Sequence, residues 1–215
     1  HNAEAQTLTL DFEQSCPATP GQSEKQSFVI PVKLGLVGAD GADLVLNADG
    51  ETELVYELTE ANQTLVINGI NQAVVPSLLR GLSAPVKLDC RYSAEQLAYL
   101  MANDSDGFNR WDASQTLCLG VLKQLTQDSL HERPLSLNSQ LIDAYGALLA
   151  DESLDPAMVA LMLQLPTEAL LHEEAETIHA AAIHDARSFV RTALAGSLAD
   201  QFMAIYQRYN TQPTY

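Results

Sequence analysis

Residues 83–115 read SAPVKLDCRYSAEQLAYLMANDSDGFNRWDASQ, and this stretch decides the fold. In its first part apolar and polar residues alternate, which is the period of a half-buried strand and predicts one over residues 86–92. The period changes at Ser93, which with Gln96 three residues later matches a capping box at a helix start. The apolar residues that then recur at helical spacing are Leu97, Leu100 and Met101. The chain therefore changes from strand to helix within a few residues.

A second helix is predicted after the turn residues 104–107, and it carries Trp111, the only tryptophan of the chain. Because large aromatic side chains dominate core packing, Trp111 is expected to be a buried anchor that packs against the strands. Everything before Ser93 is patterned as strands, and everything after it as helices. We therefore predict two domains with almost no linker, a β domain over residues 1–92 and an α-helical domain over residues 93–215.

The charge of the chain excludes some classes of partner. The 215 residues carry a formal net charge of −17, and 47% of them are hydrophobic, which is normal for a chain that buries a core. Residues 1–92 hold 12 acidic and 5 basic side chains, and residues 93–215 hold 16 and 6, so acidity is spread over both halves. A field of this sign repels phosphate, so neither nucleic acid nor an anionic membrane is an expected partner.

The cysteines and the chain ends indicate the cellular compartment of the protein. Cys16, Cys90 and Cys118 are an odd number at wide spacing, which predicts reduced structural thiols rather than a disulfide framework or a metal site. Reduced thiols predict a cytoplasmic protein. No apolar run is long enough to span a bilayer, and no signal peptide is visible. The chain opens at His1 without an initiator Met, which fits a processed mature chain as well as a piece of a longer protein.

The first half has the strand spacing of an immunoglobulin-like or fibronectin-like β-sandwich. Pro31, inside the second strand, argues for an edge position or a bulge, because proline cannot donate a ladder hydrogen bond. The seven predicted strands are residues 7–13, 28–37, 44–46, 54–58, 64–67, 74–82 and 86–92.

The second half predicts an array of paired antiparallel helices. Asp155 followed by Pro156 is a helix-start signal, and Thr167 is a candidate cap of a later short helix. The last helix is predicted to run unbroken over residues 180–209, roughly 45 Å at 1.5 Å per residue. The short helices before it offer little cover for its apolar stripe, so further helices of a longer chain are expected to pack on it. The predicted helices are residues 94–101, 108–125, 137–149, 158–165, 167–175 and 180–209.

No catalytic signature is visible. A zinc peptidase helix needs HExxH, and the two His-Glu pairs, at His131 and His172, lack the second histidine. Nucleophile elbows and phosphate-binding glycine loops are also missing from the sequence. Glu176 and His179 match Glu-x-x-His, but one such pair among His172, Glu176, His179 and His184 does not make a metal site. We therefore assign no catalytic, cofactor-binding or metal-ligating residue to this chain.

The hinge stretch also carries a family resemblance. Residues 76–115 read PSLLRGLSAPVKLDCRYSAEQLAYLMANDSDGFNRWDASQ, and this run resembles the corresponding junction in the bacterial aminopeptidase N family, zinc-dependent alanyl aminopeptidases of the gluzincin class. Supporting matches lie at residues 7–36 and 64–70 before it, and at residues 134–166 and 191–209 after it. The resemblance covers essentially the whole chain in order.

The resemblance implies a role without chemistry of its own. In that family a β domain, a thermolysin-like catalytic domain, a small β-sandwich and a large α-helical domain follow one another. This chain looks like the third domain and the start of the fourth, and no residue matches the family's HExxH or catalytic tyrosine. The implied function is a non-catalytic portion of an enzyme that removes N-terminal residues from peptides. It would pack on the catalytic domain and the remaining helices, and help to wall the substrate cavity. Zinc would belong to the parent catalytic domain and no cofactor to this chain.

Two other classes stay open at this point. A stand-alone sandwich-helix interaction module would have polar faces on its last helix and a self-contained core. A helical metalloenzyme would depend on the isolated Glu-x-x-His pair at Glu176 and His179. An HExxH encoded upstream of His1 would separate the aminopeptidase hypothesis from both.

Overall fold

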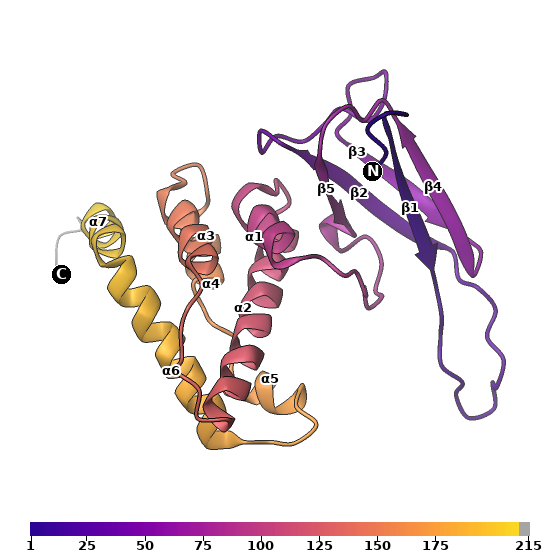
Figure 1. Cartoon of the computed structure of the whole chain (residues 1–215). Helices are drawn as coiled ribbons and strands as arrows, with labels where there is room; N and C mark the ends of the chain where they lie inside the picture. The colour runs from indigo at the N-terminus through magenta and orange to yellow at the C-terminus, as the bar shows by residue number, and fades with distance from the viewer. Residues whose placement is uncertain (211–215) are drawn as a thin grey trace. The chain divides into compact units, whose positions relative to one another are not determined.

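The computed structural model describes residues 1–210, and these divide into two compact units that we treat separately (Figure 1). The sandwich unit comprises His1–Arg91 together with Asn103–Asn109, and the helical unit comprises Tyr92–Ala102 and the residues from Arg110 onward. Strands thus come first and helices second, as predicted. Within residues 1–210, no helix combines the length and the apolar character that crossing a bilayer requires.

Two antiparallel sheets form the sandwich unit. Strand β1 (Thr7–Glu13) pairs with β4 (Asn62–Asn68), with Leu8 opposite Ile67. The second sheet has the order β3-β2-β5, and Figure 1 shows β2 running through its middle. Its strands are β3 (Glu53–Leu58), β2 (Ile30–Gly38) and β5 (Val74–Leu78).

One apolar core joins the two sheets. Every strand contributes at least one buried aliphatic side chain to it, as expected where two sheets pack face to face. Phe12 of β1 stacks on Tyr56 of β3, with ring centroids 5.4 Å apart, and so links one sheet to the other. The buried core residues are Leu8, Val32, Leu34, Leu36, Leu58, Ile67, Ile70 and Leu78.

The structure contradicts three of the predicted strand assignments. Residues 44–46 make only single backbone contacts, such as Leu44 N–H to Leu36 O at 2.9 Å, because the turns on both sides leave no room for a ladder. The strand predicted over residues 74–82 ends at Leu78, where the chain enters a 3₁₀ turn. Residues 86–92 have the alternating pattern but form no strand.

Pro31 predicted an edge strand or a bulge. The strand itself is not an edge strand, but Pro31 lies in a part of it that is paired on one side only. Strand β2 is the central strand of its sheet. Pro31 pairs only with Glu57 of β3, since the pairing of β2 with β5 begins at Leu34. The missing N–H of Pro31 therefore lies where β2 has a neighbour on one side only.

Seven helices make up the helical unit as far as residue 210, with the predicted caps in place. The capping box is confirmed: Gln96 N–H donates to Ser93 Oγ at 3.2 Å, and Ser93 N–H donates to Gln96 Oε1 at 2.9 Å. Asp155 and Thr167 cap the helices that follow them. The helices are α1 (Ala94–Asn103), α2 (Gly107–Leu130), α3 (Ser139–Ala150), α4 (Pro156–Met162), α5 (Glu168–Glu173), α6 (Ala180–Ser197) and α7 (Ala199–Tyr209).

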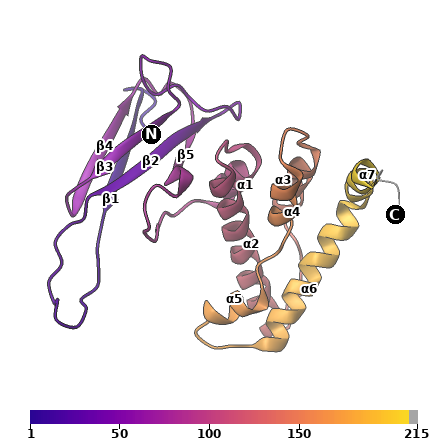
Figure 2. The ribbon, with the colours of Figure 1, turned by 180° about the vertical axis from the view of Figure 1, so that it is seen from behind.

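The single long final helix predicted from the sequence is two helices. Leu198 has φ −115° and ψ 20°, outside the helical region, and separates α6 from α7. In Figures 1 and 2 α6 is seen along its length while α7 is seen nearly end-on, so the chain changes direction there. The weak helix formers Gly196 and Ser197 come just before the break. Helix α6 buries one face, whereas α7 has no buried residue.

Candidate functional site

The most unusual group in the sandwich unit is a buried arginine. Arg80 follows β5 in the 3₁₀ turn Arg80–Leu82, and its side chain has no exposed surface. The turn is sharp, because Leu79, Gly81 and Leu82 all lie in the left-handed region, with φ of 57°, 63° and 53°. A leucine there costs on the order of 1–2 kcal/mol, so the interactions of Arg80 must hold the turn in place.

Those interactions engage four of the five N–H groups of the guanidinium. Arg80 Nη1 and Nη2 donate to the two carboxylate oxygens of Asp43, each at 2.8 Å, in a bidentate pair. Nη2 also donates to Asp104 Oδ1 at 3.0 Å, and Nε donates to Ser77 Oγ at 2.9 Å. Gly35 of β2 lies beneath the guanidinium, where an added Cβ would come within 2.4 Å of it. Only glycine therefore fits at position 35 while Arg80 stays buried.

The connection between α1 and α2 completes this cluster. Besides Asp104, this connection supplies Asp106, whose Oδ2 accepts the Gly81 N–H at 2.8 Å. Asn109 Nδ2 donates to Ser77 Oγ at 2.9 Å and to Leu78 O at 2.8 Å. Residues 103–109 are thus fastened to the strands by side chains, although they connect two helices. We call Asp43, Ser77, Arg80, Asp104, Asp106 and Asn109 the Arg80 cluster.

The two carboxylates on Arg80 have pKa values shifted in opposite directions. Burial raises the pKa of Asp104 above its ordinary value, and its Oδ2 is buried without a hydrogen-bond partner among the described residues. Burial also opposes the charge of Asp43, but hydrogen bonds from Arg80 and Ser105 outweigh it and lower the pKa of Asp43. Asp43 is therefore the stronger ionic partner of Arg80, whereas the negative charge of Asp104 costs free energy to bury.

A second buried arginine serves the helical unit. Arg110 Nε donates to the carbonyl oxygen of Met101 at 2.7 Å, and its Nη2 donates to Ala102 O. The same Nη2 donates to Asp151 Oδ2 at 3.1 Å. Arg110 thereby satisfies carbonyls at the end of α1 that have no helical partner. Like the Arg80 cluster, this arrangement uses its hydrogen bonds for structure.

Cys118 and Tyr145 form a buried polar pair between α2 and α3, with Sγ and Oη 3.2 Å apart. Burial raises the pKa of the Cys118 thiol to about 11, and burial beside that thiol raises the pKa of Tyr145 as well. Neither group is ionised near neutral pH, so Cys118 is a structural thiol and not a nucleophile.

Native thiol labelling should therefore separate the three cysteines. At pH 8 a maleimide is expected to modify the exposed Cys16 and Cys90 rapidly, and the buried Cys118 only after unfolding in urea. Mass spectrometry over time would follow the reaction, with the Cys118→Ser variant as the control that keeps both fast sites. Three thiols that react at one rate in the native chain would contradict the buried position of Cys118.

The residues weighed for metal binding are not gathered into a ligand set. His184 Nδ1 lies 2.9 Å from Glu168 Oε1 on the surface, and His179 begins α6. His172 is at the end of α5, and its Nε2 is buried without a hydrogen-bond partner among the described residues. Across residues 1–210, no three His, Cys, Asp or Glu side chains converge as a metal site would require. Glu176 lies in a surface groove with His179.

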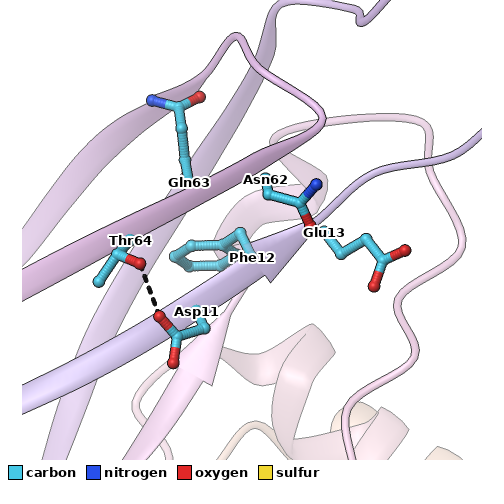
Figure 3. A pocket seen from close by; sticks show the side chains of 6 residues that line it. All are labelled: Asp11, Phe12, Glu13, Asn62, Gln63 and Thr64. Atoms are coloured by element: carbon cyan, nitrogen blue, oxygen red, sulfur yellow. Dashed lines mark hydrogen bonds between the residues drawn. The ribbon is translucent and has the colours of Figure 1, made fainter.

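Neither of two surface hollows in the described residues has the chemistry of a reaction site. Figure 3 shows the first, of about 400 Å³, across the ends of β1 and β4, where Thr64 Oγ1 donates to Asp11 Oδ1 at 2.6 Å. The second, of about 690 Å³, lies between the end of α2 and the α5–α6 connection. Lys123 and Glu174 form an ion pair on its wall at 3.0 Å. Both hollows are open to solvent, unlike an enclosed substrate pocket.

Sequence reasoning missed the Arg80 cluster. Its members are spread over more than 60 residues, from Asp43 to Asn109, and no spacing rule connects them. The one local signal is a lone arginine inside the apolar run 74–82, which read as part of a strand. Trp111 also differs from its prediction, since it is half-buried rather than enclosed. Its packing against the strands stays a prediction.

Two family descriptions match the chain. "Domain of unknown function (DUF3458) Ig-like fold" matches residues 1–91, and "Domain of unknown function (DUF3458_C) ARM repeats" matches residues 94–215. ARM repeats are stacked helices in which each repeat contacts its neighbours. An Ig-like sandwich followed by a helical array is therefore the fold of this chain, as the sequence predicted.

Similar proteins cover the whole chain. Aminopeptidase N of Escherichia coli (strain K12) is 38% identical over 216 residues, which are 100% of this chain and 25% of that protein. Aminopeptidase N of Haemophilus influenzae is 33% identical, over 96% of this chain and 24% of that protein. The crystal structure of Legionella pneumophila aminopeptidase A in complex with aspartic acid superposes with a TM-score of 0.78. It is 24% identical and covers 100% of this chain and 23% of its own, which shows the shared fold. The resemblance noted from the sequence is thus confirmed, and the chain spans about a quarter of the length of these curated relatives.

Proposed function

The chain belongs to the family described as a domain of unknown function (DUF3458_C) with ARM repeats, and we propose that it is a non-catalytic portion of a longer zinc aminopeptidase. That enzyme would remove N-terminal amino acids from peptides. The observation that carries the proposal is the full-length match to proteins named aminopeptidase N, over only a quarter of their length. In this proposal the chemistry belongs to the rest of the enzyme.

Among residues 1–210, no set of side chains fits a catalytic zinc. Such a site takes three protein ligands and leaves a position open for water. His184 pairs with Glu168 on the surface, and no third His, Cys, Asp or Glu side chain of the described residues joins them. We therefore place the zinc of the parent outside this chain and derive no chemical step through its residues.

With the zinc placed outside this chain, its role would be to support the catalytic part of the enzyme. The Arg80 cluster fastens residues 103–109 to the sandwich unit with charged hydrogen bonds. Arg110 does the same for the end of α1 in the helical unit. Such hydrogen-bonded clusters hold the residues of a scaffold in place. The scaffold would pack on the catalytic domain and wall part of the substrate cavity. We also propose domain limits at residues 1–92 and 93–215, with residues 103–109 held by the first domain.

The final helix favours this proposal over a stand-alone interaction module. A self-contained module should end on a polar face, but three large side chains of α7 are half or more exposed: Met203, Tyr206 and Tyr209. Further helices of the parent chain would cover them, as neighbouring repeats do in ARM arrays. A cytoplasmic location also stays part of the proposal, supported by three free thiols.

Charges placed on α7 test this packing. In the full-length protein, Met203→Asp and Tyr206→Asp are each expected to lower the free energy of unfolding by about 1.5–3 kcal/mol, because a buried apolar contact is lost. In the chain of 215 residues the same variants should change it by less than about 0.5 kcal/mol. Gln201→Asp, at an exposed position on the opposite side of the same helix, is the control. Equal small effects in both proteins would show that nothing packs on α7.

The gene itself gives the simplest test of the proposed function. We expect an HExxH motif in the coding sequence upstream of His1, and alanyl aminopeptidase activity in the complete protein. An open reading frame that begins directly at His1, or a complete protein without aminopeptidase activity, would rule the proposal out.

A further inference from the structure

Residues 85–91 have the pattern of a strand but do not form one. Val86 and Leu88 alternate with charged residues, yet the segment is neither strand nor helix. Each of these two aliphatic side chains is 42% exposed, and Leu82 just before them is 61% exposed. The segment therefore carries large apolar side chains that are only partly covered.

The backbone of residues 87–89 is equally unused. Val86 N–H donates to Ala84 O at 2.9 Å, a contact local to the turn. Within residues 1–210, the backbone groups of Lys87, Leu88 and Asp89 form no hydrogen bond. A row of free donors and acceptors beside alternating apolar side chains is what a neighbouring strand engages.

Hydrogen bonds hold the residues that come just before the segment. Ser83 Oγ accepts the Lys33 N–H of β2 at 3.0 Å, and Gly81 N–H is held by Asp106 at 2.8 Å. Behind them Arg80 is fully buried in its cluster. The start of residues 85–91 is therefore placed relative to the sandwich unit by several hydrogen bonds. A segment presented in this way loses less conformational entropy when a partner binds than a free loop would.

We propose that residues 85–91 are a strand whose neighbour is a segment of the same full-length polypeptide outside residues 1–215. The inference rests on the proposed function, which makes this chain a portion of a longer enzyme. The chain spans about a quarter of its curated relatives, so most of such a polypeptide is available as an intramolecular partner at high effective concentration. A second copy is a poorer occupant, because two chains of net charge −17 repel each other.

Hydrogen exchange tests the pairing at the residues concerned. We compare the full-length protein with the chain of 215 residues, amide by amide, across residues 85–91. Paired amides should exchange at least about 100-fold more slowly in the full-length protein than in the shorter chain. Amides of β2 are the internal standard, since they are hydrogen-bonded in both proteins. Equal exchange of residues 87–89 in the two proteins would overturn the inference.

A pair of variants ties the protection to the segment. In the full-length protein, the double variant Val86→Asp/Leu88→Asp should remove the protection, whereas Val29→Asp, at a 69% exposed valine of the sandwich unit, should leave it intact. Slow exchange in the short chain that depends on its concentration would identify a second copy as the partner, and would overturn the inference. An active full-length aminopeptidase without protection of residues 85–91 would also overturn it while leaving the proposed function in place. A full-length protein without aminopeptidase activity would instead defeat the proposed function.

Discussion

Arg80→Met is expected to lower the free energy of unfolding of the sandwich unit by about 3–5 kcal/mol. The substitution leaves Asp104, which has no exposed side-chain surface, and Asp43 without their cation. It also frees the Leu79–Leu82 turn, in which three residues are held in the left-handed region. Hydrogen exchange of the β2 amides in rising denaturant would measure the loss separately from the helices.

Two comparisons make that result specific to the buried charges. Arg133→Met removes a surface pair with Asp128 and should cost less than about 1 kcal/mol. The triple variant Arg80→Met/Asp43→Asn/Asp104→Asn should recover part of the loss, because no uncompensated charge remains buried. A cost below about 1 kcal/mol for Arg80→Met, or no recovery in the triple variant, would refute the structural role of the cluster.

Leu122→Ala is the second large effect, expected at about 2–5 kcal/mol in the helical unit. Leu122 is fully buried in α2, and its truncation leaves a cavity among side chains of the neighbouring helices. Trp111 on the same helix provides a fluorescence signal for urea unfolding. Leu130→Ala truncates the same residue type at a 36% exposed position of α2, and should cost less than about 1 kcal/mol. Equal costs at the two positions would show that α2 does not bury the face assigned to it.

The sequence predicted correctly those structural features that residues close together in the chain determine. Strand β1 was predicted with its observed limits, because its alternation is uninterrupted and turns bound it. The cap hydrogen bonds of Ser93, Asp155 and Thr167 were predicted because a helix start is satisfied by side chains a few residues away.

The predictions from the sequence failed where residues far apart in the chain determine the structure. The apolar run 74–82 reads as one strand, but Arg80 turns inward to carboxylates that are 37 residues before it and 24 residues after it in the chain. The alternation of residues 86–92 was recognised, but a strand also needs a neighbour, and local pattern does not say where that neighbour is. The break at Leu198 follows a Gly-Ser pair that helical periodicity alone passes over.

We propose that this chain supports an aminopeptidase whose zinc and catalytic residues lie elsewhere in the polypeptide. The most direct test is to purify the chain of 215 residues, measure its bound zinc, and assay release of alanine from an alanyl anilide. We expect zinc below about a tenth of an equivalent and no hydrolysis. Stoichiometric zinc together with hydrolysis that a chelator abolishes would contradict the claim.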